Sequence, residues 1–225
     1  PKRSGVGSRS FKLSFDLGLI PNDADTKSFA WPSSTVLDSK ELEVFRAKLS
    51  EKAFAEQFEA SWEQAGGLIF YSFSKKDHIR DDLCVYNPSL PLRIGMDFNV
   101  DPMSWVIGQH IPELNRLVIF DEIYIRNTNT PEALKELHSR WGDKHALSGG
   151  SDLFVFTPDA ASKQRHTSAA LSDYVHIVNC TLFKNKEVHV MPANPARADR
   201  FSVCNSVMRN ADGDIKFYMH TRCKY

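Results

Sequence analysis

In the first third of the chain, apolar residues recur at the spacing of a helix. Phe54, Phe58 and Trp62 are four residues apart, so they would share one face of a helix that begins near Ser39 and ends at the glycine pair 66–67. A single apolar stripe of this kind indicates a helix that packs on a sheet.

After this helix the pattern changes to short apolar runs with turn residues between them. Runs rich in Val, Ile, Phe and Trp predict strands, and segments with apolar residues at helical spacing predict helices. One helix has clear boundary signals, with Thr130 as the expected N-cap and Pro131 at its first position. The predicted strands are 68–73, 92–98, 104–111, 116–125, 153–159, either 175–180 or 187–193, and one that follows a turn within 210–220; the predicted helices are 130–141, 168–175 and 196–210, and the charged run 75–82 is a predicted loop.

The order of these elements predicts the fold class. Three successive strands joined by short turns indicate an antiparallel meander, whereas the later strands alternate with helices that can serve as crossovers between parallel strands. We therefore predict an α/β protein with the ribonuclease H-like arrangement. This is a mixed sheet, composed of an antiparallel three-strand meander plus parallel strands, with helices on both faces.

Composition and charge narrow the function only slightly. With 28 basic and 28 acidic residues the formal net charge is zero, so any contact with nucleic acid would come from a local patch. The four cysteines form no CxxC pair, which argues against a structural zinc site. No apolar run is long enough to span a membrane and the first residues do not resemble a signal peptide, so we expect a soluble, cytoplasmic protein.

Two aspartates end apolar strands: Asp97 ends the run LRIGMD, and Asp159 ends LFVFTPD. If the two strands are parallel neighbours, their ends lie about 4.8 Å apart. Two carboxylates at that spacing could share hard divalent cations, as in two-metal phosphodiester hydrolysis. Taken alone, an aspartate at a strand end is more often a turn former or a helix cap, so the prediction rests on the pair together with the fold order.

Three further acidic residues are auxiliary candidates. Asp121 and Glu122, near the end of the third strand of the meander, are either a solvated pair on an edge strand or auxiliary residues of the site. Asp199 begins the last long helix, where its carboxylate would also interact favourably with the helix dipole.

Basic residues near these acids are candidates for contacts with DNA phosphates. Lys163 and Arg165 follow Asp159 in a segment rich in hydroxyl groups, and Arg200 lies in the last long helix. A soluble loop is an equally good interpretation of the first segment. The sequence has no phosphate-binding loop, nucleophile elbow or dinucleotide fingerprint, so we expect no nucleotide to bind here.

Four segments, in this order, resemble the nuclease domain of the large subunit of tailed-bacteriophage terminases: GMDFNVDPMSWVIGQ, VIFDEIYIRNTNTPEAL, PDAASKQRHTSAALSDY and NPARADRFSVCNSVMRNADGDIKFYMHTRCKY. Upstream, LSEKAFAEQFEASWEQAGGLIFYSF resembles the linker between the packaging ATPase and the nuclease. The resemblance implies that residues 1–90 hold this linker region and the end of the ATPase portion. It also implies that 91–225 form a ribonuclease H-like nuclease domain that is truncated at its C-terminus.

The resemblance implies a metal-dependent endonuclease that cuts concatemeric double-stranded DNA when the viral genome is packaged. Asp97 and Asp159 would be its catalytic ligands for Mg²⁺ or Mn²⁺ in a two-metal site. Its partners would be DNA and, in the full protein, the small terminase subunit, the portal and the procapsid. It would contact no membrane and would act in the cytoplasm of an infected or lysogenic bacterium. We expect this fragment to be a monomer.

The third acidic ligand of the family leaves alternatives open. It usually follows the last strand in a pattern like His-x-x-Asp-Ala, which this sequence does not contain, so the fragment would bind metal weakly and cut poorly. One alternative is another ribonuclease H-like nuclease, such as a transposase, integrase or resolvase. The others are a non-catalytic module that docks on DNA or on the packaging motor, and a structural domain whose acidic strand ends are turns.

Overall fold

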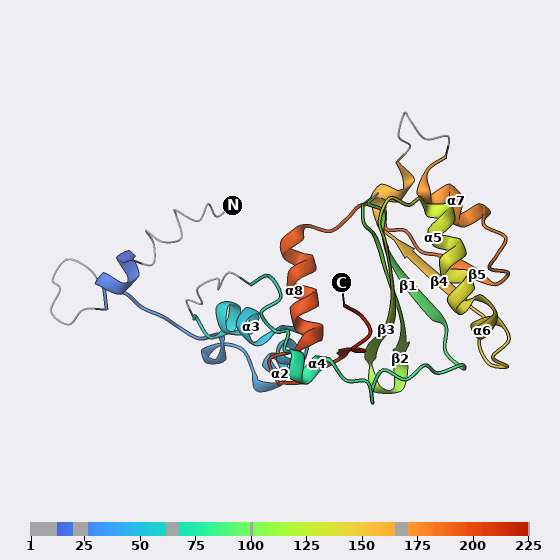
Figure 1. The fold of residues 1–225 in the computed structure, drawn as a ribbon. Helices are drawn as coiled ribbons and strands as arrows, with labels where there is room; N and C mark the ends of the chain where they lie inside the picture. Colours follow the sequence, from blue (N-terminus) through green and yellow to red (C-terminus); the bar gives the residue numbers. More distant parts are fainter. Residues whose placement is uncertain (1–12, 20–26, 62–67, 100, 165–170, 225) are drawn as a thin grey trace. The chain divides into compact units, whose positions relative to one another are not determined.

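The computed structural model describes residues 13–19, 27–61, 68–99, 101–164 and 171–224. The chain divides into two compact units, which Figure 1 draws as one ribbon. Unit 1 takes its described residues from Pro1–Tyr71 and Ser202–Asp214, and unit 2 takes them from Ser72–Phe201 and Ile215–Tyr225. The segments of each unit are therefore far apart in the sequence.

Unit 2 is built on a mixed sheet. Across the described residues its strand order is β5-β4-β1-β2-β3-β6. The pairs β1–β2 and β2–β3 are antiparallel, whereas β1–β4, β4–β5 and β3–β6 are parallel. With helices around this sheet, the predicted ribonuclease H-like fold class is confirmed. The strands are β1 (Leu92–Asp97), β2 (Met103–Ile111), β3 (Arg116–Ile125), β4 (Phe154–Pro158), β5 (Lys186–Val188) and β6 (Phe217–Met219).

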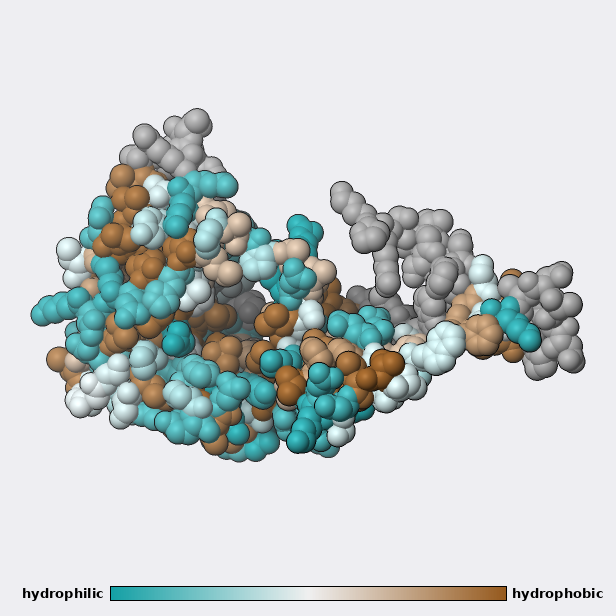
Figure 2. Space-filling model, turned by 180° about the vertical axis from the view of Figure 1, so that it is seen from behind, coloured by the Kyte–Doolittle hydropathy of each residue, from teal (hydrophilic) through white to brown (hydrophobic). Residues whose placement is uncertain are grey.

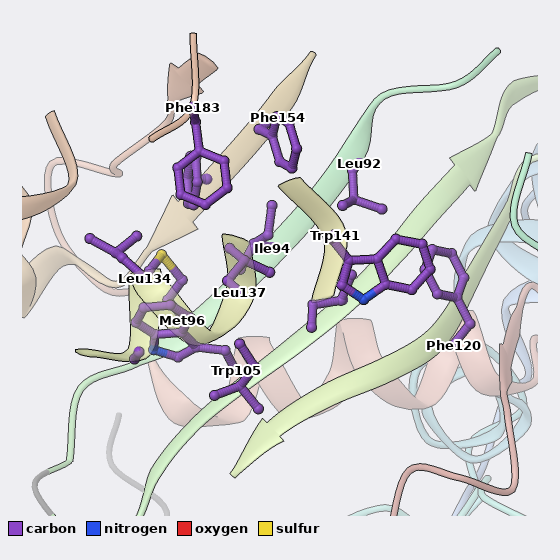
Figure 3. Close-up of a cluster of buried hydrophobic side chains, with 14 of the residues drawn as sticks. Leu92, Ile94, Met96, Trp105, Phe120, Leu134, Leu137, Trp141, Phe154 and Phe183 are labelled. Atoms are coloured by element: carbon purple, nitrogen blue, oxygen red, sulfur yellow. The ribbon is translucent and has the colours of Figure 1, made fainter. Parts of the chain in front are cut away.

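The alternation of residues along β1 defines the core. Leu92, Ile94 and Met96 point to one face and are buried, whereas Arg93 and Asp97 point to the other face and are exposed. Figure 3 shows the buried side chains of β1 beside aromatic and aliphatic residues from the other strands and from the helical segment 130–142. Burial of each large apolar side chain stabilises the folded state by about 1.5–3 kcal/mol relative to leaving it exposed to water.

Short helices connect or flank the strands of unit 2. The helix α5 has the largest buried stripe, and a turn of π-helix extends it so that Trp141 also reaches the core. The helix α8 begins in unit 2 and ends in unit 1. The helical segments are α4 (Lys75–His78), η2 (Pro112–Leu114), α5 (Thr130–Leu137), η3 (His138–Gly142), α6 (Asp143–Ala146), η4 (Ala160–Lys163), α7 (Asp173–Asn179) and α8 (Arg197–Met208).

Unit 1 contains η1 (Ser33–Thr35), α2 (Ser39–Lys48) and α3 (Glu51–Phe58). A buried asparagine ties its two chain segments together. Asn210 donates to the Ala47 carbonyl at 3.2 Å and to Asp214 Oδ2 at 3.0 Å, and its backbone forms a β-bridge with Ser50. A polar side chain that is 1% exposed needs such partners, because burial without hydrogen bonds is costly.

The predicted helix that begins near Ser39 is interrupted in unit 1. Ser50 accepts a hydrogen bond from the Ala53 N–H and starts a second helix, because a serine at this position competes with helix continuation by capping. Trp62 and the glycine pair 66–67 lie outside the described residues. The strand predicted at 68–73 was wrong, since these residues form bends and turns with Leu68, Ile69, Phe70 and Tyr71 exposed.

Two local predictions in unit 2 were also wrong, and one open choice was decided. Within the charged run 75–82, residues 75–78 form α4. The N-cap of α5 is Asn129, whose side chain accepts from the Glu132 N–H, and Thr130 instead donates to Asp173 in α7. Between the two segments offered for the next strand, 187–193 contains the end of β5, whereas 175–180 is mostly helical. An apolar run of six residues cannot distinguish a strand from one buried face of a short helix.

Exposed apolar side chains occur in both units, for example Phe29 and Trp31 in unit 1 and Val106 and Met191 in unit 2. On the face seen in Figure 2, apolar residues are interspersed with hydrophilic ones. Among the described helices, none combines the length and the apolar character needed to cross a membrane.

Candidate active site

Two aspartates lie at the adjacent ends of β1 and β4. In the parallel register Gly95 pairs with Thr157 and Met96 with Pro158, and Asp97 and Asp159 are the next residues along the two chains. Asp159 is still extended, with φ −68° and ψ 166°. Because neighbouring strands are about 4.8 Å apart and paired residues point to the same face, the two carboxylates share one edge and one face of the sheet.

Asp159 has a structural role as well as a place in this pair. Its Oδ1 accepts from the Ser162 N–H at 3.0 Å and thereby caps η4, while the Ser162 hydroxyl donates to the Asp159 carbonyl at 2.6 Å. Its Oδ2 is 3.5 Å from the Asn194 side-chain nitrogen. The two interpretations of this aspartate are therefore compatible, because capping fixes the carboxylate at the strand end and leaves acceptor capacity on both oxygens.

Asp97 is held by a local contact. Its Oδ2 accepts from the Asn99 side chain at 2.9 Å, and the residue is exposed, whereas Asp159 is half-buried. Two accessible carboxylates fit Mg²⁺ or Mn²⁺, since these hard cations take oxygen ligands and Mg²⁺ is commonly held by one or two carboxylates together with water and phosphate. Within the described residues, no group of three or more His, Cys, Asp or Glu side chains is placed to hold one metal ion.

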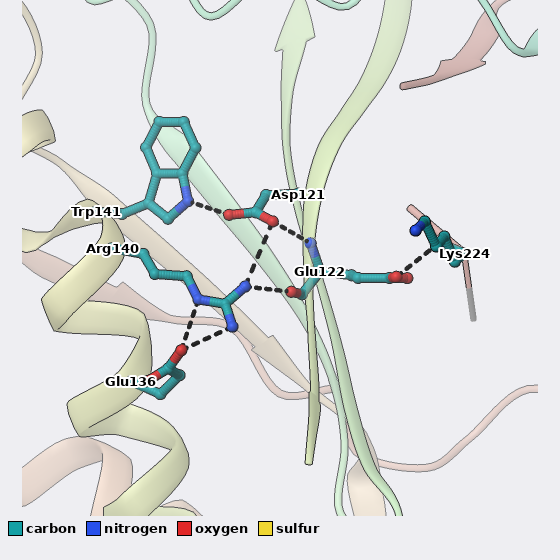
Figure 4. Close-up of polar contacts among 6 residues, drawn as sticks. All are labelled: Asp121, Glu122, Glu136, Arg140, Trp141 and Lys224. Carbon is teal, nitrogen blue, oxygen red and sulfur yellow. Dashed lines mark hydrogen bonds and ion pairs between the residues drawn. The ribbon is translucent and has the colours of Figure 1, made fainter. Parts of the chain in front are cut away.

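Asp121 and Glu122 were open between a solvated pair on an edge strand and auxiliary residues of the site. Both are half-buried in β3, and within the described residues β6 pairs with β3 only over Leu117–Ile119, before the two acids. Asp121 pairs with Ile107 and points to the core side, where its Oδ2 accepts from Trp141 Nε1 at 2.7 Å. Arg140 Nη1 is 3.6 Å from the other oxygen of this carboxylate (Figure 4). Asp121 therefore anchors the helical segment on the sheet and lies on the opposite face from Asp97.

Glu122 shares a sheet face with Asp97 but belongs to a more distant strand. It pairs with Val106, which pairs with Gly95, so it is two strands, or about 10 Å, from β1. Its Oε1 accepts from the Lys224 N–H at 2.6 Å (Figure 4). The register therefore does not place Glu122 beside the pair at the ends of β1 and β4.

The remaining predicted site residues are an acid and three basic residues that follow Asp159 in the sequence. Lys163 is exposed at the end of η4, four residues after Asp159, with its Nζ 5.6 Å from the centroid of the Tyr174 ring. Asp199 and Arg200 are exposed in the first turn of α8, where Asp199 suits the helix dipole. Arg165 lies outside the described residues.

Two asparagines contact the carboxylates and were not among the predicted site residues. Asn99 follows Asp97 by two positions, so its short-range contact could have been inferred from the sequence, because asparagine commonly bonds to near neighbours. Asn194 is 35 positions from Asp159. The Asn-Pro pair at 194–195 signals a turn, but no linear pattern connects that turn to β4.

Comparison with protein-family models and with curated proteins gave no match. Solved structures did match. One crystal form of the large terminase of a thermophilic bacteriophage has a TM-score of 0.58 and 13% identity, over 96% of this chain and 48% of that chain. Another crystal form of the same terminase has a TM-score of 0.53 and 14% identity, over 95% and 49%. The nuclease domain of the P22 large terminase has a TM-score of 0.49 and 11% identity, over 69% and 73%.

The chain thus spans about half the length of the thermophilic-phage terminase chains. At such low identity the likeness establishes the fold, and this fold agrees with the resemblance seen in the sequence. The strand order and the two crystal forms of that terminase together show that this chain has the fold of a bacteriophage large terminase over about half the length of those proteins.

Proposed function

We propose that this chain is the nuclease part of a large terminase, a metal-dependent endodeoxyribonuclease that cuts concatemeric double-stranded DNA. One observation supports the proposal: Asp97 and Asp159 directly follow the last paired residues of two neighbouring parallel strands, in a sheet with the terminase fold. Acidic residues brought together in this way have the donor set that Mg²⁺ or Mn²⁺ requires.

The two aspartates would hold the metal ions. When bound, two ions of this kind activate a water molecule and stabilise the leaving oxygen of a phosphodiester. The protein would contribute the fixed strand ends, which hold the carboxylates in place, and an exposed edge that admits a DNA backbone. Lys163 and Arg200 are exposed and could contact phosphates, which would position the DNA without reading its sequence; we propose the same role for Arg165.

The proposed terminase role suggests a substrate and partners. We propose double-stranded DNA as the substrate and, for the whole protein, the small terminase subunit, the portal and the procapsid as partners. The place of action would be the cytoplasm of a bacterial host, and this fragment would be a monomer.

The test is cleavage of supercoiled plasmid in Mn²⁺ by the wild-type chain and by Asp97→Asn and Asp159→Asn. Each substitution keeps the side-chain shape but removes a charged ligand, so we expect cleavage to fall by more than about 100-fold while the melting temperature stays within a few degrees. Asp152→Asn is the matched control, because Asp152 is an exposed aspartate just before β4, at the other end of that strand. Undiminished cleavage by Asp97→Asn would refute the assignment.

A docking module without chemistry is the second candidate. It is favoured by the observation that, in the described part of the chain, the strand ends supply a pair of carboxylates rather than a group of three or more metal-binding residues. DNA binding by the wild-type chain without any cleavage in Mn²⁺ would support this candidate over the nuclease.

A further inference from the structure

We propose that Asn194 is a positioning residue for Asp159. Its amide holds the turn after β4 and orients the carboxylate toward the edge shared with Asp97. The inference rests on the proposed function, because it assigns Asn194 a role through a proposed metal ligand. The inference extends the site beyond the ends of β1 and β4, because Asn194 lies in the segment before α8.

The two ends of the Asn194 amide contact consecutive residues. The side-chain oxygen accepts from the Ala160 N–H at 3.0 Å, and the side-chain nitrogen is 3.5 Å from Asp159 Oδ2. The first contact ties the segment before α8 to the start of η4. The second contact reaches the carboxylate oxygen that does not cap η4.

The chemistry of the partners fixes the orientation of this amide. A backbone N–H can only donate, so the atom facing Ala160 must be the oxygen of Asn194. The NH₂ group then faces the carboxylate, where it can donate. The alternative orientation would place two donors against each other and an oxygen against a carboxylate.

Together, Ser162 and Asn194 restrict Asp159 from two sides. The Ser162 N–H holds Oδ1 at 3.0 Å, and Asn194 holds Oδ2, so rotation of the carboxylate about its side-chain bonds would break one contact or the other. Groups that orient metal ligands in this way commonly change metal affinity by about 10–100-fold when they are removed. Because the contact between Asn194 and Asp159 Oδ2 is long, we expect the loss of metal affinity on removing Asn194 to lie near the lower end of this range.

The experiment compares Asn194→Ala with Asn185→Ala and Asp159→Asn. Asn185 is a matched control, since it is an exposed asparagine that donates to an aspartate, Asp152, at 2.6 Å beside the opposite end of β4. The measurements are Mn²⁺ affinity by titration calorimetry, the kcat and KM for plasmid cleavage, the melting temperature, and hydrogen exchange of the Ala160 amide without metal.

For Asn194→Ala we expect Mn²⁺ affinity to fall about 10-fold and kcat to fall, with KM for DNA little changed. Exchange of the Ala160 amide should accelerate, whereas Asn185→Ala should keep the wild-type Mn²⁺ affinity, kcat, KM and Ala160 exchange. Wild-type Mn²⁺ affinity in Asn194→Ala, with weakened affinity in Asp159→Asn, would overturn the role of Asn194 and leave the proposed function standing. An equal loss in Asn185→Ala would also overturn it. A wild-type chain that binds no Mn²⁺ would overturn both proposals.

Discussion

The contact between Trp141 and Asp121 allows a sharp test of how the helical segment 130–142 is held on the sheet. Trp141 is 3% exposed and donates to Asp121 Oδ2 at 2.7 Å, while the Asp121 side chain is 15% exposed. Replacing Trp141 by Phe keeps an aromatic ring in the core but removes this donor. The carboxylate then keeps Arg140 at 3.6 Å and the Glu122 N–H at 2.9 Å.

Trp105 provides the matched comparison. It is fully buried in the same core, and among the described residues its Nε1 has no hydrogen-bond partner. Both substitutions, Trp141→Phe and Trp105→Phe, therefore lose similar apolar contact, but only the first removes a hydrogen bond to a charged acceptor. Such a bond contributes about 1.5–3 kcal/mol, so Trp141→Phe should destabilise the protein by about that much more than Trp105→Phe.

Urea denaturation of the two variants would measure the difference as a change in midpoint with an unchanged m-value. The same measurement in an Asp121→Asn background should shrink the difference, because the cycle then isolates the Trp141–Asp121 contact. Equal losses for the two tryptophan variants would refute the reasoning, since they would show that this hydrogen bond adds no net stability.

Two further predictions concern buried ionisable groups. His145 is fully buried between the Tyr86 hydroxyl and the Leu153 carbonyl, and burial lowers its pKa. Below about pH 6.5 the unfolded chain therefore binds a proton that the folded chain does not, so the stability of the wild-type protein should decrease as the pH is lowered, by up to about 1.4 kcal/mol per pH unit. In urea unfolding at a series of pH values, His145→Gln should flatten this part of the profile. Equal slopes in both proteins would contradict the prediction. Burial also raises the pKa of Cys84 to about 11 and of Cys223 to about 12. At pH 8 iodoacetamide should therefore label the exposed Cys204 well before either of these two thiols. Labelling of Cys84 or Cys223 as fast as Cys204, measured by mass spectrometry, would contradict this prediction.

The sequence by itself determined the type and order of most elements in unit 2. The strands around Ile94, Trp105 and Ile119 were predictable because their apolar runs are long, rich in β-formers and separated by turn residues. Asp97 and Asp159 could be selected because each ends such a run. Predictions failed for short segments, such as 68–73, where six residues carry too little periodic signal and packing decides the conformation.

Only the tertiary structure decided which residues lie together. The pairing of β1 with β4 puts Asp97 and Asp159 at adjacent strand ends, and this pairing depends on contacts between residues about 60 positions apart, which no local pattern encodes. The same is true of Asn194, whose amide reaches back to β4 because the chain before α8 returns to that edge. Asp121 shows the converse: beside Glu122 it resembled a surface acid, but the pleat of β3 places it on the core side with Ile107, where its carboxylate accepts from Trp141.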